Sequence, residues 1–140
     1  GGTRVPFILS WPSIIDPGTS DALVNQIDFL RSFASLIGQQ LPNNAGVDSR
    51  DTLDAFLGKS GKGLPYMIEE AANAIALRKG EWKYIQFHAS KYKPNPGAPE
   101  LYNLREDPSE TDNLILKYPK IADALRTELV NIQHSAGIYN

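Results

Sequence analysis

The second half of the chain alternates short apolar runs with turn residues, and this pattern limits the possible fold more than any other feature. Four runs have the length and composition of strands: residues 66–70, 74–78, 82–87 and 100–104. The segment Lys79-Gly80-Glu81 between the second and third runs has the length of a hairpin connection with a central glycine. We therefore expect a small antiparallel sheet of about four strands.

A final helix follows this sheet in the sequence. Pro119 can occupy its first turn, and apolar residues then recur every three or four positions at Ile121, Leu125, Leu129 and Ile132. Antiparallel strands with one helix across a face form a stable small unit. The predicted fold class is α+β, with the sheet packed against a C-terminal helix.

The first half of the chain has a different pattern. Consecutive apolar residues within residues 4–11 favour a short strand that is buried on both faces, and residues 22–24 are a second candidate strand. A helix should begin near Asp28 and end at Gly38, and residues 52–57 should form a helical turn. Residues 58–63 contain three glycines, so we place a domain boundary there, with a solvated linker.

Composition excludes several functions. The chain has 14 basic and 16 acidic residues and a net charge of −2, without the basic stripe that is typical of nucleic-acid-binding proteins. No apolar run approaches the roughly 20 residues that span a membrane. The absence of cysteine excludes disulfides, thiolate zinc sites and a cysteine nucleophile from these 140 residues, and two histidines do not suggest a multi-histidine metal site.

One basic loop is a candidate binding site. His88 ends the third predicted strand and precedes Lys91 and Lys93, so the three cations could bind a sulfate, phosphate or carboxylate group at the rim of a pocket. The alternative is an edge histidine near solvated lysines.

Two other clusters have simpler explanations than a ligand site. Four acidic residues lie near a turn without the alternating pattern of a calcium loop, which favours capping and a solvated turn: Glu106, Asp107, Glu110 and Asp112. Trp82 and Tyr84 share one face of their strand, where packing against the final helix is favoured over an exposed aromatic platform.

The first residues, Gly1 and Gly2, suggest a close backbone approach to something outside this chain. We interpret them as the exit from a site whose other walls lie upstream.

The chain resembles the sulfatases of the alkaline-phosphatase-like superfamily in five motifs, which occur in the family's order and cover nearly all residues. These motifs are GGTRVPFILSWP, SDALVNQIDFLRSFASLIG, DSRDTLDAFLG, ALRKGEWKYI and ELYNLREDPSETDNL. The resemblance implies that residues 1–58 are a strand–helix remnant of a large α/β domain and that residues 59–140 form the C-terminal subdomain. Gly1, Gly2, Arg4 and Pro6 match the family's active-site wall.

The resemblance also implies which parts are absent. Sulfatases of this type use a formylglycine made from Cys or Ser in a C/S-x-P-x-R motif, and no serine here has that continuation. Their calcium ligands also lie upstream. We therefore expect a fragment that has no catalytic residue, metal or cofactor of its own and is inactive alone. Its parent is expected to use calcium and formylglycine, and its partner would be the N-terminal catalytic part of the same chain.

Several alternatives stay open. The chain could be the tail of a phosphonate or phosphate-ester hydrolase of the same superfamily, or a freestanding carbohydrate-binding module that uses Trp82, Tyr84 and His88. For a sulfatase we expect a sulfated small molecule or glycan as the parent's substrate and a periplasmic or secreted location. Exposed strand edges, such as that of residues 5–9, would allow the fragment to self-associate.

Overall fold

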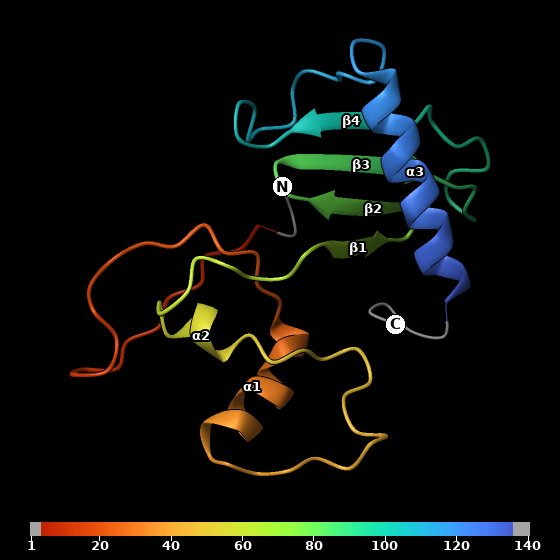
Figure 1. Cartoon of the computed structure of the whole chain (residues 1–140). Helices are drawn as coiled ribbons and strands as arrows, with labels where there is room; N and C mark the ends of the chain where they lie inside the picture. Colours follow the sequence, from red (N-terminus) through yellow and green to blue (C-terminus); the bar gives the residue numbers. More distant parts are fainter. Residues whose placement is uncertain (1–3, 136–140) are drawn as a thin grey trace. The chain divides into compact units, whose positions relative to one another are not determined.

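A computed structural model describes residues 4–135, which divide into two compact units (Figure 1). The first unit contains residues 5–65, and the second unit contains residues 66–135 together with Arg4. The division falls between Pro65 and Tyr66, two residues beyond the end of the glycine-rich segment 58–63. The assignment of residues 1–58 to a larger α/β domain stays a prediction. No helix among the described residues is both long and apolar enough to cross a membrane.

The second unit contains a four-stranded antiparallel sheet in the order β1-β2-β3-β4. Its strands are β1 (Met67–Ala71), β2 (Ala74–Lys79), β3 (Trp82–Phe87) and β4 (Glu100–Asn103). Lys79 pairs with Trp82, so Gly80 and Glu81 form a two-residue hairpin loop in which Gly80 has a φ of 57°. The four predicted strands and their hairpin are confirmed.

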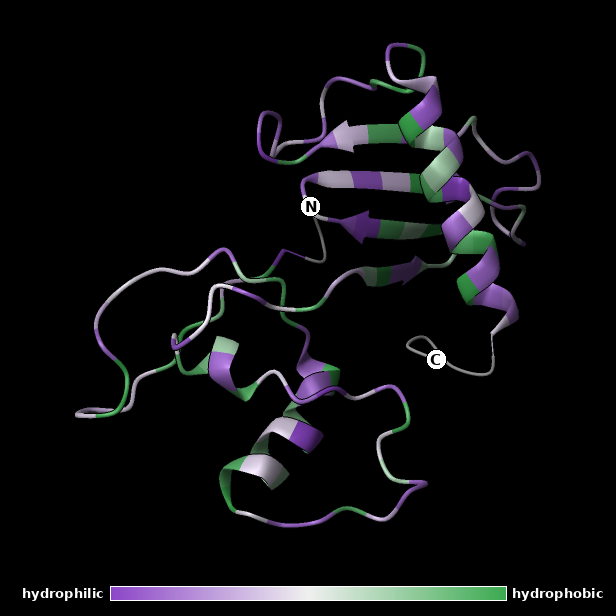
Figure 2. Ribbon diagram, in the orientation of Figure 1, coloured by the Kyte–Doolittle hydropathy of each residue, from purple (hydrophilic) through white to green (hydrophobic). Residues whose placement is uncertain are grey.

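Helix α3 (Pro119–His134) covers one face of this sheet, as predicted (Figure 1). Register aligns one row of side chains across all four strands: Ile68, Leu77, Tyr84 and Leu101. Leu125 and Leu129 of α3 pack against this row, and green apolar segments mark both layers in Figure 2. The α+β fold class is confirmed.

The two aromatic residues of β3 belong to this core. The Tyr84 side chain is almost completely buried, and the Trp82 ring packs edge-on against Tyr118 with centroids 5.3 Å apart. Packing against the final helix is therefore the correct interpretation. Tyr84 cannot serve as a contact residue of a carbohydrate-binding face.

The first unit contains three short helices: η1 (Gln26–Asp28), α1 (Phe29–Leu36) and α2 (Leu53–Phe56). Asn25 caps η1 by accepting a hydrogen bond from the Ile27 N–H, and Gly38 follows α1 with a φ of 68°. The predicted helix and helical turn are confirmed.

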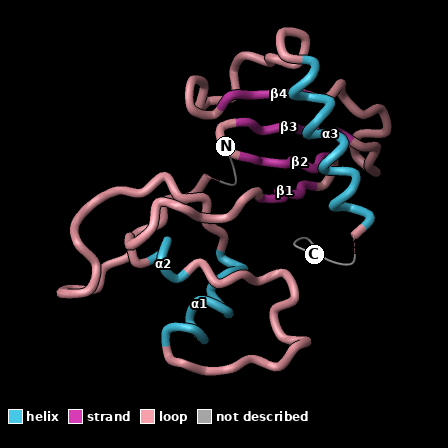
Figure 3. The backbone as a smooth tube through the Cα atoms, viewed as in Figure 1, coloured by secondary structure: helices cyan, strands magenta, loops and turns pink. Residues whose placement is uncertain are grey.

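The strand predicted for residues 4–11 is wrong, as Figure 3 shows by drawing this segment as loop. Its apolar side chains are exposed, with Ile8 at 87% and Val5 at 59%. A strand that is buried on both faces needs neighbouring strands, and the described residues of this unit form none. Phe7 packs against the helices of this unit, with ring centroids 5.8 Å from Phe29 and 5.7 Å from Phe56.

The strand predicted for residues 22–24 is also wrong, but this segment contacts the glycine-rich stretch closely. The Leu64 N–H donates to the Leu23 carbonyl oxygen at 2.7 Å. A Cβ at Gly63 would lie 2.0 Å from that same oxygen. Residue 63 must therefore be glycine for this backbone contact, so the stretch is not simply a solvated linker.

Polar side chains of three residues in η1 and α1 hold residues 45–52 against these helices. The Asp28 carboxyl accepts from the Arg50 N–H at 2.8 Å, and the Ser32 hydroxyl accepts from the Thr52 N–H at 2.9 Å. Arg31 donates from its guanidinium to two carbonyl oxygens of the same loop. Burial raises the pKa of Asp28 above its usual range.

Candidate functional site

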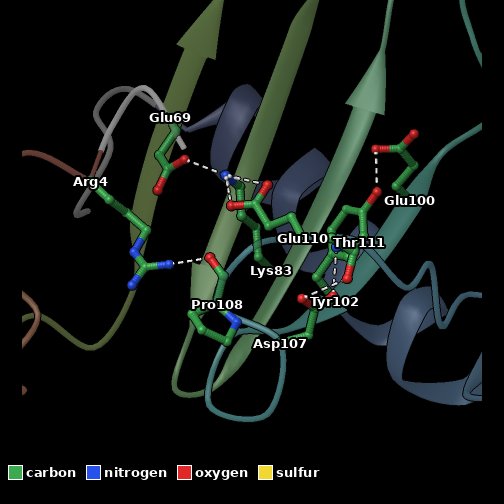
Figure 4. A network of polar contacts seen from close by, with 9 residues as sticks. All are labelled: Arg4, Glu69, Lys83, Glu100, Tyr102, Asp107, Pro108, Glu110 and Thr111. Atoms are coloured by element: carbon green, nitrogen blue, oxygen red, sulfur yellow. Dashed lines mark hydrogen bonds and ion pairs between the residues drawn. The ribbon is translucent and has the colours of Figure 1, made fainter.

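The sheet face opposite α3 contains a buried cluster of charges (Figure 4). Lys83 extends from β3 onto this face, and its side chain is only 7% exposed. Its Nζ lies 2.9 Å from Glu69 Oε2 and 3.1 Å from Glu110 Oε1. The cluster thus joins strand β1, strand β3 and the segment that follows β4.

Glu110 reaches Lys83 because a compact turn sets its position. Asp107 accepts hydrogen bonds from the backbone N–H groups of Thr111 at 2.7 Å and Asp112 at 2.8 Å, and from the Thr111 hydroxyl at 3.1 Å. Glu110 itself has a φ of 57°. The hydrogen bond from the Asp112 N–H, followed by those of Thr111, lowers the pKa of the Asp107 carboxyl.

This geometry tests the interpretation of the acidic cluster. The capping role of Asp107 is confirmed, whereas the prediction of a solvated turn is wrong for Glu110, whose carboxylate is buried against Lys83. Among the described residues, no group of three or more His, Cys, Asp or Glu side chains could hold a metal ion.

Arg4 contacts the same turn. Its guanidinium donates a hydrogen bond to the Pro108 carbonyl oxygen (Figure 4). Among the other predicted wall residues, Gly1 and Gly2 lie outside the described residues, and Pro6 is exposed. The contact between residues 4 and 108 could not be predicted from the sequence.

Tyr102 lies beside Lys83 in the register of β3 and β4. Its hydroxyl donates to Glu100 Oε2 at 2.9 Å. Burial, reinforced by this hydrogen bond, raises the pKa of Tyr102 to about 12. Tyr102 is therefore a protonated donor in neutral solution and a structural part of this sheet face.

The basic loop lies at the far end of β3. The His88 N–H donates to the Asn73 carbonyl oxygen at 2.9 Å, which extends the β2–β3 pairing by one position. Lys91 and Lys93 flank Tyr92, whose side chain is 83% exposed. The structure thus places His88, Lys91 and Lys93 on one exposed loop, and it adds Tyr92, which the sequence argument did not include.

The comparisons with known proteins cover the whole described chain. The family described as N-sulphoglucosamine sulphohydrolase, C-terminal, matches residues 2–135. An N-acetylgalactosamine-6-O-sulfatase of Bacteroides thetaiotaomicron is 35% identical over 94% of this chain and 28% of its own length. Arylsulfatase A of Bos taurus is 30% identical over 99% of this chain and 32% of its own length.

Solved structures agree with these similarities. One structure, from work on the metabolism of multiple glycosaminoglycans by Bacteroides thetaiotaomicron, has a TM-score of 0.83 at 35% identity. It covers 96% of this chain, which corresponds to 30% of that protein. A second structure, a complex with its substrate D-glucosamine-2-N,6-O-disulfate, has a TM-score of 0.65 at 23% identity. It covers 88% of this chain and 26% of its own chain. This similarity supports the fold alone. The chain therefore spans less than a third of the length of these relatives.

Proposed function

The chain belongs to the family of C-terminal sulfatase domains, as its five motifs predicted, and from this membership we propose that it is the C-terminal portion of a sulfuric ester hydrolase. The observation that carries the proposal is the family match over residues 2–135. The relatives described above are named as sulfatases, which favours this class over a phosphonate or phosphate-ester hydrolase. Their names also support a sulfated sugar or aryl sulfate as the substrate of the whole protein.

Sulfate-ester hydrolysis needs a nucleophile, positive charge against the sulfate oxygens and an acid for the leaving group. These 140 residues contain no cysteine and no serine in the S-x-P-x-R pattern. We propose that a formylglycine nucleophile and a calcium site belong to the rest of the protein, where they would supply the attacking oxygen and the positive charge. The chain alone is then inactive.

The role proposed for this chain is to shape one wall of the pocket and to support it. Lys83 and Glu110 fix the turn that presents the Pro108 carbonyl, and that carbonyl accepts the hydrogen bond from Arg4. Arg4 stands two residues after the Gly pair that resembles the family's active-site wall. The buried charges thereby support the turn that Arg4 contacts.

The first unit offers a surface for the proposed catalytic part. Large apolar side chains are exposed along residues 5–14, on α1 and at its C-cap, including Ile8 at 87% and Ile37 at 75%. An accumulation of exposed large apolar side chains is typical of an interface. We propose that the upstream part of the same protein covers it.

A substrate comparison with the longer protein tests the proposed class. The protein extended upstream of Gly1 should release sulfate from 4-nitrophenyl sulfate and from a 6-O-sulfated N-acetylgalactosamine, and chelation of calcium should abolish the release. Faster cleavage of a phenyl phosphonate ester than of either sulfate would contradict the proposal and favour the phosphonate hydrolase alternative.

A further inference from the structure

The tip of the basic loop is a closed turn. The Ser90 N–H donates to the Lys93 carbonyl oxygen at 2.9 Å, and the Lys93 N–H donates back to the Ser90 carbonyl at 3.2 Å and to the Ser90 hydroxyl at 3.1 Å. These reciprocal bonds place Lys91 and Tyr92 at the two central positions of a β-turn.

Both ends of the loop are restrained as well. On the entry side, the His88 N–H bonds to Asn73, so the loop leaves directly from the β2–β3 ladder. On the return side, Pro94, Pro96 and Pro99 restrict the backbone dihedral angles. Gly97 lies close to the Phe87 ring, since a Cβ at this position would be 3.5 Å from it. The turn therefore loses little conformational entropy when a ligand binds.

The turn also has a distinctive chemistry. Residues 88–99 contain two lysines and a histidine and no acidic residue, although the chain has a net charge of −2. The Tyr92 side chain is 83% exposed, and Lys91 Nζ lies 5.7 Å from the centre of its ring. An exposed aromatic ring with one ammonium group beside it, and a second lysine next in the sequence, matches a ligand that has both an apolar ring face and negative charges.

We propose that residues 90–93 are a binding site for anionic oligosaccharides, a proposal that rests on the sulfatase function proposed above. The Tyr92 ring stacks on the C–H face of one sugar, while Lys91 and Lys93 bind sulfate or carboxylate groups on neighbouring sugars. His88 lies at the base of the loop, where its N–H continues the β2–β3 pairing. The site holds sugars beyond the one that is cleaved, so it selects polymeric over small substrates.

Kinetics of the longer protein provide the first test, with a 6-O-sulfated chondroitin tetrasaccharide and 4-nitrophenyl sulfate as substrates. Lys91→Ala/Lys93→Ala and Tyr92→Leu should each lower kcat/KM for the tetrasaccharide about tenfold, mostly through KM, and leave the aryl sulfate unchanged. Tyr92→Phe should retain the wild-type value because its ring still stacks. Lys117→Ala/Lys120→Ala, which removes two exposed charges elsewhere, is the matched control. Unchanged tetrasaccharide kinetics, or a parallel loss on both substrates, would overturn the proposal.

Calorimetric titration of the 140-residue chain provides a second test that does not depend on sulfatase activity. The chondroitin tetrasaccharide should bind, and the Lys91→Ala/Lys93→Ala variant should lose this binding. If the 140-residue chain binds the tetrasaccharide but the longer protein has no sulfatase activity, the proposed function is refuted and the proposed binding site is supported. Equal binding of a single-stranded oligonucleotide or of anionic lipid vesicles, or no loss in the variant, would overturn the assignment to sugars.

Discussion

Lys83→Met should destabilise the second unit strongly, because the buried Lys83 ammonium group contacts both Glu69 and Glu110. The substitution keeps the length and much of the volume of the side chain but leaves two carboxylates buried without their shared ammonium group. Breaking a buried ion pair by removal of one partner costs about 3–5 kcal/mol. A domain of this size has a total stability of only about 5–15 kcal/mol.

Chemical denaturation followed by circular dichroism measures this loss, and a thermal scan gives the change in Tm. Each kcal/mol corresponds to about 4–8 °C for a domain of 60–100 residues, so the expected decrease is at least about 12 °C. Lys79→Met is the matched control, because its 2.7 Å ion pair with Glu128 is on the adjacent strand and is 48% exposed at the lysine. That change should cost less than about 1 kcal/mol.

A triple replacement separates the cost of removing the shared ammonium group from the contribution of the whole cluster to stability. Lys83→Met combined with Glu69→Leu and Glu110→Leu should recover most of the lost stability, because well-packed apolar side chains often replace buried ion pairs without penalty. The reasoning is refuted if Lys83→Met costs no more than Lys79→Met. It is also refuted if the triple variant is as unstable as the single one.

Two further predictions concern local geometry. Gly63→Ala should destabilise the first unit by about 1–3 kcal/mol, since its Cβ would overlap the Leu23 backbone. Gly61→Ala should have little effect, because no atom lies within 4 Å of a Cβ at that position. Hydrogen exchange in residues 5–65 measures the difference, and equal protection in both variants would contradict the prediction. Asp107 has a lowered pKa in the folded state, so it stabilises the fold above the usual carboxyl range and this contribution is lost as the pH falls through the folded pKa. Asp107→Asn should therefore show a shallower loss of stability below about pH 4 than the wild type, and identical slopes would refute this.

The sequence predicted the second unit well because its signals are local. Alternating side chains, the Gly80 hairpin and the stripe of α3 each depend on residues within a few positions of one another. The strand prediction for residues 4–11 was wrong because a strand needs neighbouring strands, and a run of apolar residues does not identify them.

The charged cluster on the sheet face opposite α3 could not be predicted from local sequence patterns. Lys83 joins two carboxylates from distant positions in the chain, and on its own it looks like a solvated strand lysine. Gly63 looked like part of a flexible linker because its close contact is with Leu23. Tyr92 was visible in the sequence, but only the Ser90–Lys93 hydrogen bonds show that it stands at the tip of a fixed turn.

We propose above that this chain completes a sulfatase without performing its chemistry. Sulfate release from 4-nitrophenyl sulfate, measured by ion chromatography for three purified samples, tests it most directly. The samples are the longer protein, the same protein without these 140 residues, and the 140-residue chain alone. We expect release only from the longer protein. Calcium-dependent release by the 140-residue chain, or a full rate without it, would contradict the claim.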